Sequence, residues 1–220
     1  MPDISFLIFQ LAVLIFSVMV HEISHGLMAE RLGDPTARLA GRLSVNPLRH
    51  LDPFGSVILP LIFFFIKSPV MLGWAKPVPY NPLGLTKDLR YGPLKVALAG
   101  PASNLILFGF FALIARLGIF SLPAPLIGLF GFIAFLNVFL AVFNLIPIPP
   151  LDGSKILTAF LPPQHALRLE RFGFQGIIFI LIFVFFFSGL ISFIAERIFL
   201  LVAGLPVLEQ ILALFAFFSG

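Results

Sequence analysis

Residues 4–25 read ISFLIFQLAVLIFSVMVHEISH. In the part of this stretch from Ile4 to Val20, the polar residues are Ser5, Gln10 and Ser17. An apolar run of this length predicts a helix buried in a membrane, and two histidines and a glutamate follow in the same helix. Ionisable groups inside such a span are costly and usually functional, so a metal centre inside the membrane is the first hypothesis.

The motif His21-Glu22-Ile23-Ser24-His25 places two imidazoles four residues apart. On a helix, both rings then lie on one face and can bind one ion, while Glu22 turns toward the side where a bound water would sit. This is the HExxH pattern of zinc hydrolases. The alternative is a pair of structural histidines beside a cap or charge pair, which the cost of ionisable groups in an apolar span disfavours.

The composition indicates a polytopic membrane protein. Of 220 residues, 60% are apolar, 29 are Phe and 11% are charged, and the mean hydropathy is +1.10. A net charge of +4 would suit nucleic acid, but the basic residues are spread through the links between apolar runs, as membrane orientation requires. No nucleic-acid partner is therefore predicted. Because the chain has no cysteine, a metal must use His, carboxylate and water as ligands.

The pattern predicts an all-α polytopic membrane protein with about five transmembrane helices. They are expected at residues 4–32, 93–116, 126–146, 176–195 and 198–217, the last of them with a break at Gly204–Pro206. A single membrane-embedded domain is expected over 1–220, with a catalytic core at about 4–160, C-terminal helices at about 176–218, and no PDZ or CBS domain.

Two shorter stretches complete the predicted fold. Residues 54–66 are apolar but short and contain Pro60, so a re-entrant segment or a short tilted helix is expected. Residues 36–46 alternate apolar and basic side chains like a strand, and the proline-rich stretch 73–82 predicts an extended loop or edge strand. The fold class therefore includes a small β-hairpin or β-loop.

Basic residues set the predicted orientation. Residues 31–95 hold nine Lys and Arg, whereas 121–125 hold none. Basic loops stay in the cytoplasm, so the amino terminus and the turn near Ser121 are predicted outside, with a retained first helix. His21 and His25 then lie toward the cytoplasmic end of that helix, in a multi-pass protein of a prokaryotic inner or plasma membrane.

Two histidines leave a catalytic zinc one protein ligand short. Asp152 is the best-placed carboxylate, because it follows an apolar span and a run of prolines, and broken backbone at membrane depth is tolerated where it lines a cavity. The alternative for Asp152-Gly153 is an ordinary turn or helix cap. Other aspartates, including Asp34, lie in the terminus or in basic loops, where a solvated carboxylate is expected. Asn144 and Asn104 could each orient a substrate or form an interhelical hydrogen bond.

Together, His21-Glu22-Ile23-Ser24-His25 and Asn144-x-x-Pro147-x-Pro149-x-x-Asp152-Gly153 resemble the paired motifs of the site-2 protease family of intramembrane zinc metalloproteases. The similarity continues through Ala99-Gly100-Pro101 and the loop 74–82. The resemblance implies a three-helix catalytic core, one zinc per chain held by His21, His25 and Asp152, and Glu22 activating water for peptide cleavage. Asn144 matches the motif asparagine, to which a substrate-holding role is assigned. The chain departs from the family's pattern because no span precedes the His-Glu helix and residues 54–66 are not part of the minimal core.

The predicted function is regulated intramembrane proteolysis by a zinc metalloendopeptidase in the lipid bilayer. A transmembrane protein or peptide substrate must unwind before cleavage, because helical hydrogen bonds shield its carbonyls. Extended segments at 38–45 and 74–82, with Trp74 and Val78, are predicted to bind it by strand addition. The alternative is a membrane metal transporter or metal-binding protein that uses the same His and Asp cluster. Glu22 argues against it, because a transporter needs no base beside its ligands.

Overall fold

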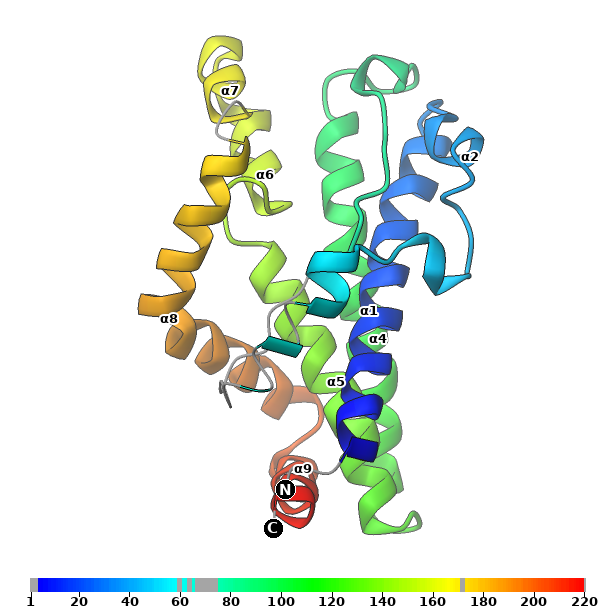
Figure 1. Cartoon of the computed structure of the whole chain (residues 1–220), viewed down its shortest axis with the longest axis vertical. Helices are drawn as coiled ribbons and strands as arrows, with labels where there is room; N and C mark the ends of the chain where they lie inside the picture. Colours follow the sequence, from blue (N-terminus) through cyan, green and yellow to red (C-terminus); the bar gives the residue numbers. More distant parts are fainter. Residues whose placement is uncertain (1–3, 59–60, 63–64, 66–74, 171–172, 220) are drawn as a thin grey trace. The chain divides into compact units, whose positions relative to one another are not determined.

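The structure is a computed structural model and describes residues 4–58, 61–62, 65, 75–170 and 173–219. Within these ranges the chain is mostly helical (Figure 1). The long helices are α1 (Ile4–Arg31), α4 (Gly92–Gly118), α5 (Ala124–Asn144) and α8 (Gly173–Val202). The shorter ones are α2 (Thr36–Leu39), α6 (Gly153–Phe160), α7 (Pro163–Glu170) and α9 (Leu205–Ser219), with the single turns η1 (Pro47–Arg49), η2 (Pro53–Ile58) and η3 (Pro82–Gly84).

Four helices in the described part of the chain are long and apolar enough to cross a membrane, where the sequence predicted about five. They are α1, α4, α5 and the part of α8 from Ile182 to Val202. The fifth span, expected at 198–217 with a break at Gly204–Pro206, is divided at that break, where Gly204 adopts a positive φ of 86° and Pro206 follows it. The remaining helix, α9, has 15 residues, which is short of the ~20 that a crossing requires.

The strand predicted at 36–46 is wrong. Residues 36–39 form α2, and Gly41 turns the chain with a φ of 64°. A strand needs a neighbour for its ladder, and no strand occurs in the ranges that the structure describes. Instead Ala37 is fully buried on α2, and the Arg42 side chain turns inward rather than toward solvent. Pro35 occupies the N-cap position of α2, and Asp34 before it accepts a hydrogen bond from the Thr36 N–H.

Two sequence predictions fall partly or wholly beyond the described residues. Of the segment 54–66, residues 54–58 belong to the π-helical turn η2, but 59–60, 63–64 and 66 lie outside the described residues, as does Trp74. The prediction that 54–66 dips into the membrane and returns therefore stays a prediction.

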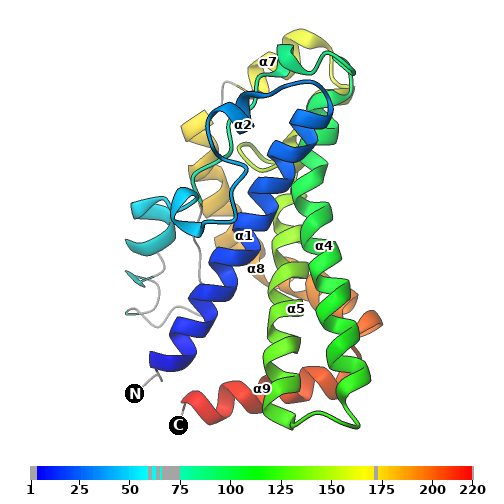
Figure 2. The ribbon, with the colours of Figure 1, turned by 90° about the vertical axis from the view of Figure 1, so that its right-hand side faces the viewer.

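The described residues form two compact units. The first, the helical unit, holds the residues up to Gln10 and those from Pro101 onward. Its helices α4 and α5 run antiparallel and are joined by a short loop, and α9 crosses beside the start of α5 (Figure 2). Gly128 and Gly131 permit this crossing, because a Cβ at Gly128 would lie 2.8 Å from the Gln210 carbonyl oxygen.

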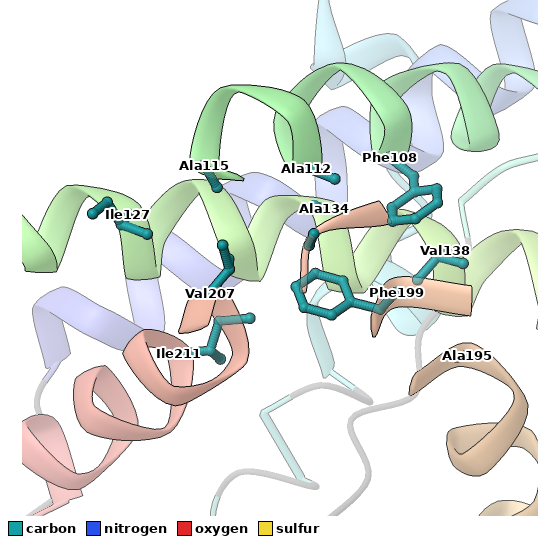
Figure 3. Close-up of a cluster of buried hydrophobic side chains, with 11 residues drawn as sticks. Phe108, Ala112, Ala115, Ile127, Ala134, Val138, Ala195, Phe199, Val207 and Ile211 are labelled. Carbon is teal, nitrogen blue, oxygen red and sulfur yellow. The ribbon is translucent and has the colours of Figure 1, made fainter. Parts of the chain in front are cut away.

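The core of the helical unit is apolar, with small residues between aromatic ones (Figure 3). Ala134 on α5 and Ala195 on α8 are fully buried in it, and Phe199 fills the space beside them with no exposed surface. Small residues let membrane helices approach closely, which gains dispersion contacts where no hydrophobic driving force exists between helices. Arg116 at the end of α4 donates from Nη1 to the Val202 carbonyl, which closes the carboxyl end of α8.

The second unit, the loop-bearing unit, comprises Leu11–Gly100. It contains most of α1, the connecting loops and the first two turns of α4. The end of α1 follows the sequence prediction, since the helix ends at Arg31 and Gly33, two residues later, takes a φ of 111°. Lys87 closes the same end, because its N–H and its Nζ donate to the carbonyls of Leu32 and Arg31 at 3.0 and 2.8 Å.

Candidate metal centre

His21 and His25 lie on one face of α1 and are both buried, with 6% and 9% of their surface exposed. Their Nε2 atoms are 3.0 Å apart, and their rings meet edge to face at 86°. Two nitrogens that bind one zinc tetrahedrally at the usual bond length are about 3.3 Å apart. The pair is therefore arranged closely enough to bind a single ion through both Nε2 atoms.

A backbone carbonyl determines which ring nitrogen of His25 carries the hydrogen. Its Nδ1 lies 2.7 Å from the carbonyl oxygen of Val96 on α4. A carbonyl can only accept, so Nδ1 must carry the hydrogen and donate it. In a neutral imidazole this leaves the lone pair on Nε2, which is the atom that faces His21. The fold thus presents His25 in the tautomer that a metal ligand needs.

Gly100 on α4 makes room for the two imidazoles. A Cβ at this position would overlap His25 Nε2 and would lie 2.6 Å from His21 Cε1. The sequence marked Ala99-Gly100-Pro101 as part of the family similarity, but it did not identify Gly100 as part of the site. The backbone of α4 in fact lies directly against the ring atoms of the candidate ligands.

Glu22 turns to a different side of α1 from the histidines. Its Oε2 accepts a hydrogen bond of 2.8 Å from the backbone N–H of Val78. One of its carboxylate oxygens and the two ring nitrogens all lie within 4.8 Å of one another. The N–H that the sequence assigned to substrate binding therefore donates to the candidate general base, and the substrate role of Val78 stays a prediction.

Asp152 belongs to the helical unit, at the start of α6. The loop before it folds back tightly, because a Cβ at Gly153 would overlap the Leu145 carbonyl oxygen. Asp152 occupies the N-cap position of α6, yet its side chain makes no capping hydrogen bond, and its Oδ2 atom is buried. The helix-cap alternative left open by the sequence is therefore not what the side chain does. Its role as the third ligand stays a proposal.

The two asparagines named from the sequence differ in their surroundings. Asn104 is fully buried on α4 and donates from Nδ2 to Asn137 Oδ1 on α5, 2.9 Å away. This is the interhelical hydrogen bond that the sequence left as the alternative to a substrate role. Its partner Asn137, also fully buried, was not singled out from the sequence. Asn144 is half-buried at the end of α5 and donates to the Leu140 carbonyl.

Comparisons with known proteins agree on one family. The model of peptidase family M50 matches residues 113–189. YwhC of Bacillus subtilis is 40% identical over 181 residues, which is 78% of this chain and 78% of that protein. Rip2 of Mycobacterium tuberculosis is 32% identical over 166 residues, which is 76% of this chain and 62% of that protein. Both relatives are named as zinc metalloproteases. No solved structure matches the chain.

Proposed function

Because the chain belongs to peptidase family M50, the site-2 protease family, we propose that it cleaves peptide bonds within or near the membrane spans of other proteins. The observation that carries this proposal is the cluster of His21, Glu22 and His25 in the second half of a helix able to cross a membrane. The cluster combines two candidate ligands with a carboxylate that can accept a proton, which is the donor set of a hydrolytic site.

Zinc suits these residues. It binds imidazole nitrogen and carboxylate oxygen, and a catalytic site keeps three protein ligands and one open position. We assign His21, His25 and Asp152 as the ligands of one zinc per chain. When bound, zinc supplies a Lewis acid that activates water and polarises a peptide carbonyl.

Glu22 is the proposed general base. Its Oε2 is held by the Val78 N–H, which directs the carboxylate and leaves Oε1 to take a proton from the attacking water. Glu22 then gives this proton to the leaving amine, so that the peptide bond breaks into an acid and an amine. Val96 contributes by fixing His25 in one tautomer.

The substrate must arrive unwound, because a helical peptide shields its carbonyls. Asn144, at the end of α5, is proposed to hold the extended chain, as the family resemblance implies. Pairing with residues 75–81 would not use the Val78 N–H, which donates to Glu22, and Pro77 and Pro79 have no N–H to offer.

The proposed orientation places the amino terminus outside the cell membrane and the histidine pair toward the cytoplasm. The motive is the concentration of Lys and Arg in residues 31–95. Single cysteines at Thr36, Lys87 and Ser121 can be labelled from either side in this cysteine-free chain. Positions 36 and 87 should label from the cytoplasmic side, and 121 from the other. Labelling of 36 and 87 from opposite sides would overturn the re-entrant reading of 54–66.

One set of variants tests the mechanism. Glu22→Gln keeps the shape of the side chain but cannot accept the proton, so it should retain about one zinc per chain and lose cleavage by about two to four orders of magnitude. His21→Ala and Asp152→Ala should lose both zinc and cleavage. The measurements are metal analysis of the purified protein and cleavage of unfolded casein that carries a quenched fluorophore.

Three outcomes would contradict parts of the proposal. Full cleavage by Glu22→Gln would reject its role as the base. Full zinc in Asp152→Ala would move the third ligand elsewhere. Zinc binding and zinc flux without any cleavage by the wild-type chain would favour the metal transporter.

A further inference from the structure

Residues 75–81, here named the strap, cross α1 beside Glu22. The strap has no regular secondary structure, and its Val78 side chain is buried with 7% of its surface exposed. Gly26, one turn after Glu22, makes the crossing possible, because a Cβ there would lie 2.9 Å from Val78 Cγ1. At this point the Val78 N–H reaches Glu22 Oε2.

Arg42 anchors the first half of the strap. Its Nη2 donates to the carbonyls of Lys76 and Pro77, and the arginine is buried with 8% of its surface exposed. The Lys76 N–H donates to the carbonyl of His50 at 2.9 Å, so this part of the strap is held from two directions. The two bonded carbonyls belong to the residues that immediately precede Val78, so Arg42 sets the position of the N–H that Glu22 accepts.

Asp34 anchors the other end. Its Oδ2 accepts from the Asn81 N–H at 2.6 Å, and its Oδ1 accepts from the Thr36 N–H at 3.1 Å and from the Thr36 hydroxyl. Asp34 is 1% exposed. Between the two anchors, Pro77 and Pro79 flank Val78 and restrict the backbone to extended conformations.

We propose that the strap is the device that positions the carboxylate of Glu22, and that Arg42 is a positioning residue that acts through it. This inference rests on the proposed function of Glu22 as general base. A glutamate on a helix surface has several rotamers, and the hydrogen bond from a fixed N–H selects among them. The selection persists only while the strap is held, and a misplacement of 1 Å at a reacting group can cost about 100-fold in rate.

The first test compares two arginines. Arg42→Ala should keep about one zinc per chain and the KM for unfolded casein, and should lose about 10- to 100-fold in kcat. Arg42→Lys, which can still donate to one carbonyl, should recover part of the loss. The matched control is Arg49→Ala, because Arg49 is exposed and donates to the Gly41 carbonyl outside the strap, so its kcat should not change.

The second test separates positioning from general stability. In a Glu22→Gln background, Arg42→Ala should lower the residual rate by less than twofold, because the group that it positions no longer accepts a proton. Val78→Pro, which removes the N–H, should lower kcat more than Val78→Ala, which keeps the N–H and trims the side chain. Zinc content is measured in every variant as the reading that does not depend on cleavage.

The outcomes distinguish the two proposals. A wild-type kcat in Arg42→Ala, an equal fold-loss from Arg42→Ala with and without Glu22, or a loss of zinc in Arg42→Ala would each overturn the positioning role. Normal cleavage by Glu22→Gln alone would instead reject the proposed function of Glu22, whatever Arg42→Ala does.

Discussion

The interiors of the two units differ in how many polar and charged side chains they bury. Among the described residues, the loop-bearing unit buries polar or charged side chains at Ser17, His21, His25, Asp34, Arg42 and His50. The helical unit buries Asn104, Asn137 and Ser154, and its core is otherwise apolar (Figure 3). Buried polar groups require hydrogen-bond partners with defined geometry, whereas apolar contacts are non-directional. The difference indicates that polar contacts place the candidate chemistry and apolar packing joins the helices.

Two glycines, one in each unit, show how the two interiors differ at single positions. Gly100 lies against the ring atoms of both histidines, whereas Gly128 lies against the backbone of α9 at Gln210. A methyl group at either position must displace something, but the displaced group differs. The contrast therefore predicts that the two substitutions affect different properties of the protein.

The largest effect is expected from Gly100→Ala. Its Cβ would overlap His25 Nε2, so the imidazoles must move apart, and zinc affinity should fall by about 100-fold. The measurement is a zinc titration of purified protein. Gly109→Ala on the same helix is the matched control, because a Cβ there meets nothing within 4 Å and zinc affinity should not change.

Gly128→Ala supplies the opposite half of the comparison. Crowding against the Gln210 carbonyl should lower the free energy of unfolding by about 1–3 kcal/mol while zinc affinity stays the same. Thermal or denaturant unfolding in detergent measures it. If Gly128→Ala weakened zinc binding as much as Gly100→Ala does, the separation between the two kinds of interior would fail.

Asp34→Ala should have the next largest effect. The substitution removes a buried acceptor and with it the hydrogen bonds from Asn81 and Thr36, which should cost about 2 kcal/mol of unfolding free energy. Denaturant unfolding of the variant beside the wild type measures this loss. A change below about 0.5 kcal/mol, the usual effect of a surface substitution, would contradict the assignment of Asp34 as a structural anchor.

The Asp34 carboxylate should also make the stability of the fold depend on pH. Burial raises the pKa of Asp34, but hydrogen bonds from Thr36 and Asn81 outweigh burial and hold this pKa below its ordinary value of 3.8. A group whose pKa is lower in the folded state stabilises the fold above its unfolded pKa, and the stabilisation is lost as the pH falls through the folded pKa. Wild-type stability should therefore fall below pH 3.8 relative to Asp34→Asn, and should show no such difference in slope near neutral pH.

The smallest effect is expected from Asn104→Ala in the helical unit. Interhelical hydrogen bonds in membranes contribute about 0.6 kcal/mol on average, so the loss of the bond to Asn137 should lower the unfolding free energy by about that amount. Measuring the KM for casein cleavage in the same variant distinguishes a structural role of Asn104 from a role in substrate binding. A raised KM with unchanged stability would show that Asn104 serves the substrate rather than the contact between α4 and α5.

The long helices could be predicted because their signals are local. The apolar runs that became α1, α4 and α5 agree with the predicted 4–32, 93–116 and 126–146 within a few residues. The prediction failed where a short segment depends on its neighbours. The alternation at 36–46 suits a strand, but burial of Ala37 and Arg42 made it a short helix and a turn. The last predicted span, 198–217, is divided at Gly204–Pro206, where the sequence already showed a break, and the helix after the break is α9, with 15 residues.

The acidic residues show the same limit. Asp34 was expected to be solvated because it lies in a basic loop, yet it is 1% exposed and bonded to Asn81, which is 47 positions away in the chain. Nothing local to Asp34 identifies that partner. The sequence signal available was the Gly33-Asp34-Pro35 turn itself, which marks the end of a helix and not the burial of a carboxylate.

Helical periodicity alone dictated that His21 and His25 share a face of α1, since a spacing of four residues has one outcome on a helix. Tertiary packing decided what each side chain meets. The Val96 carbonyl that orients His25 is 71 positions away, and the Val78 N–H that holds Glu22 is 56 positions away. Such contacts depend on how loops and helices pack against one another, and a single sequence carries no local signal for that.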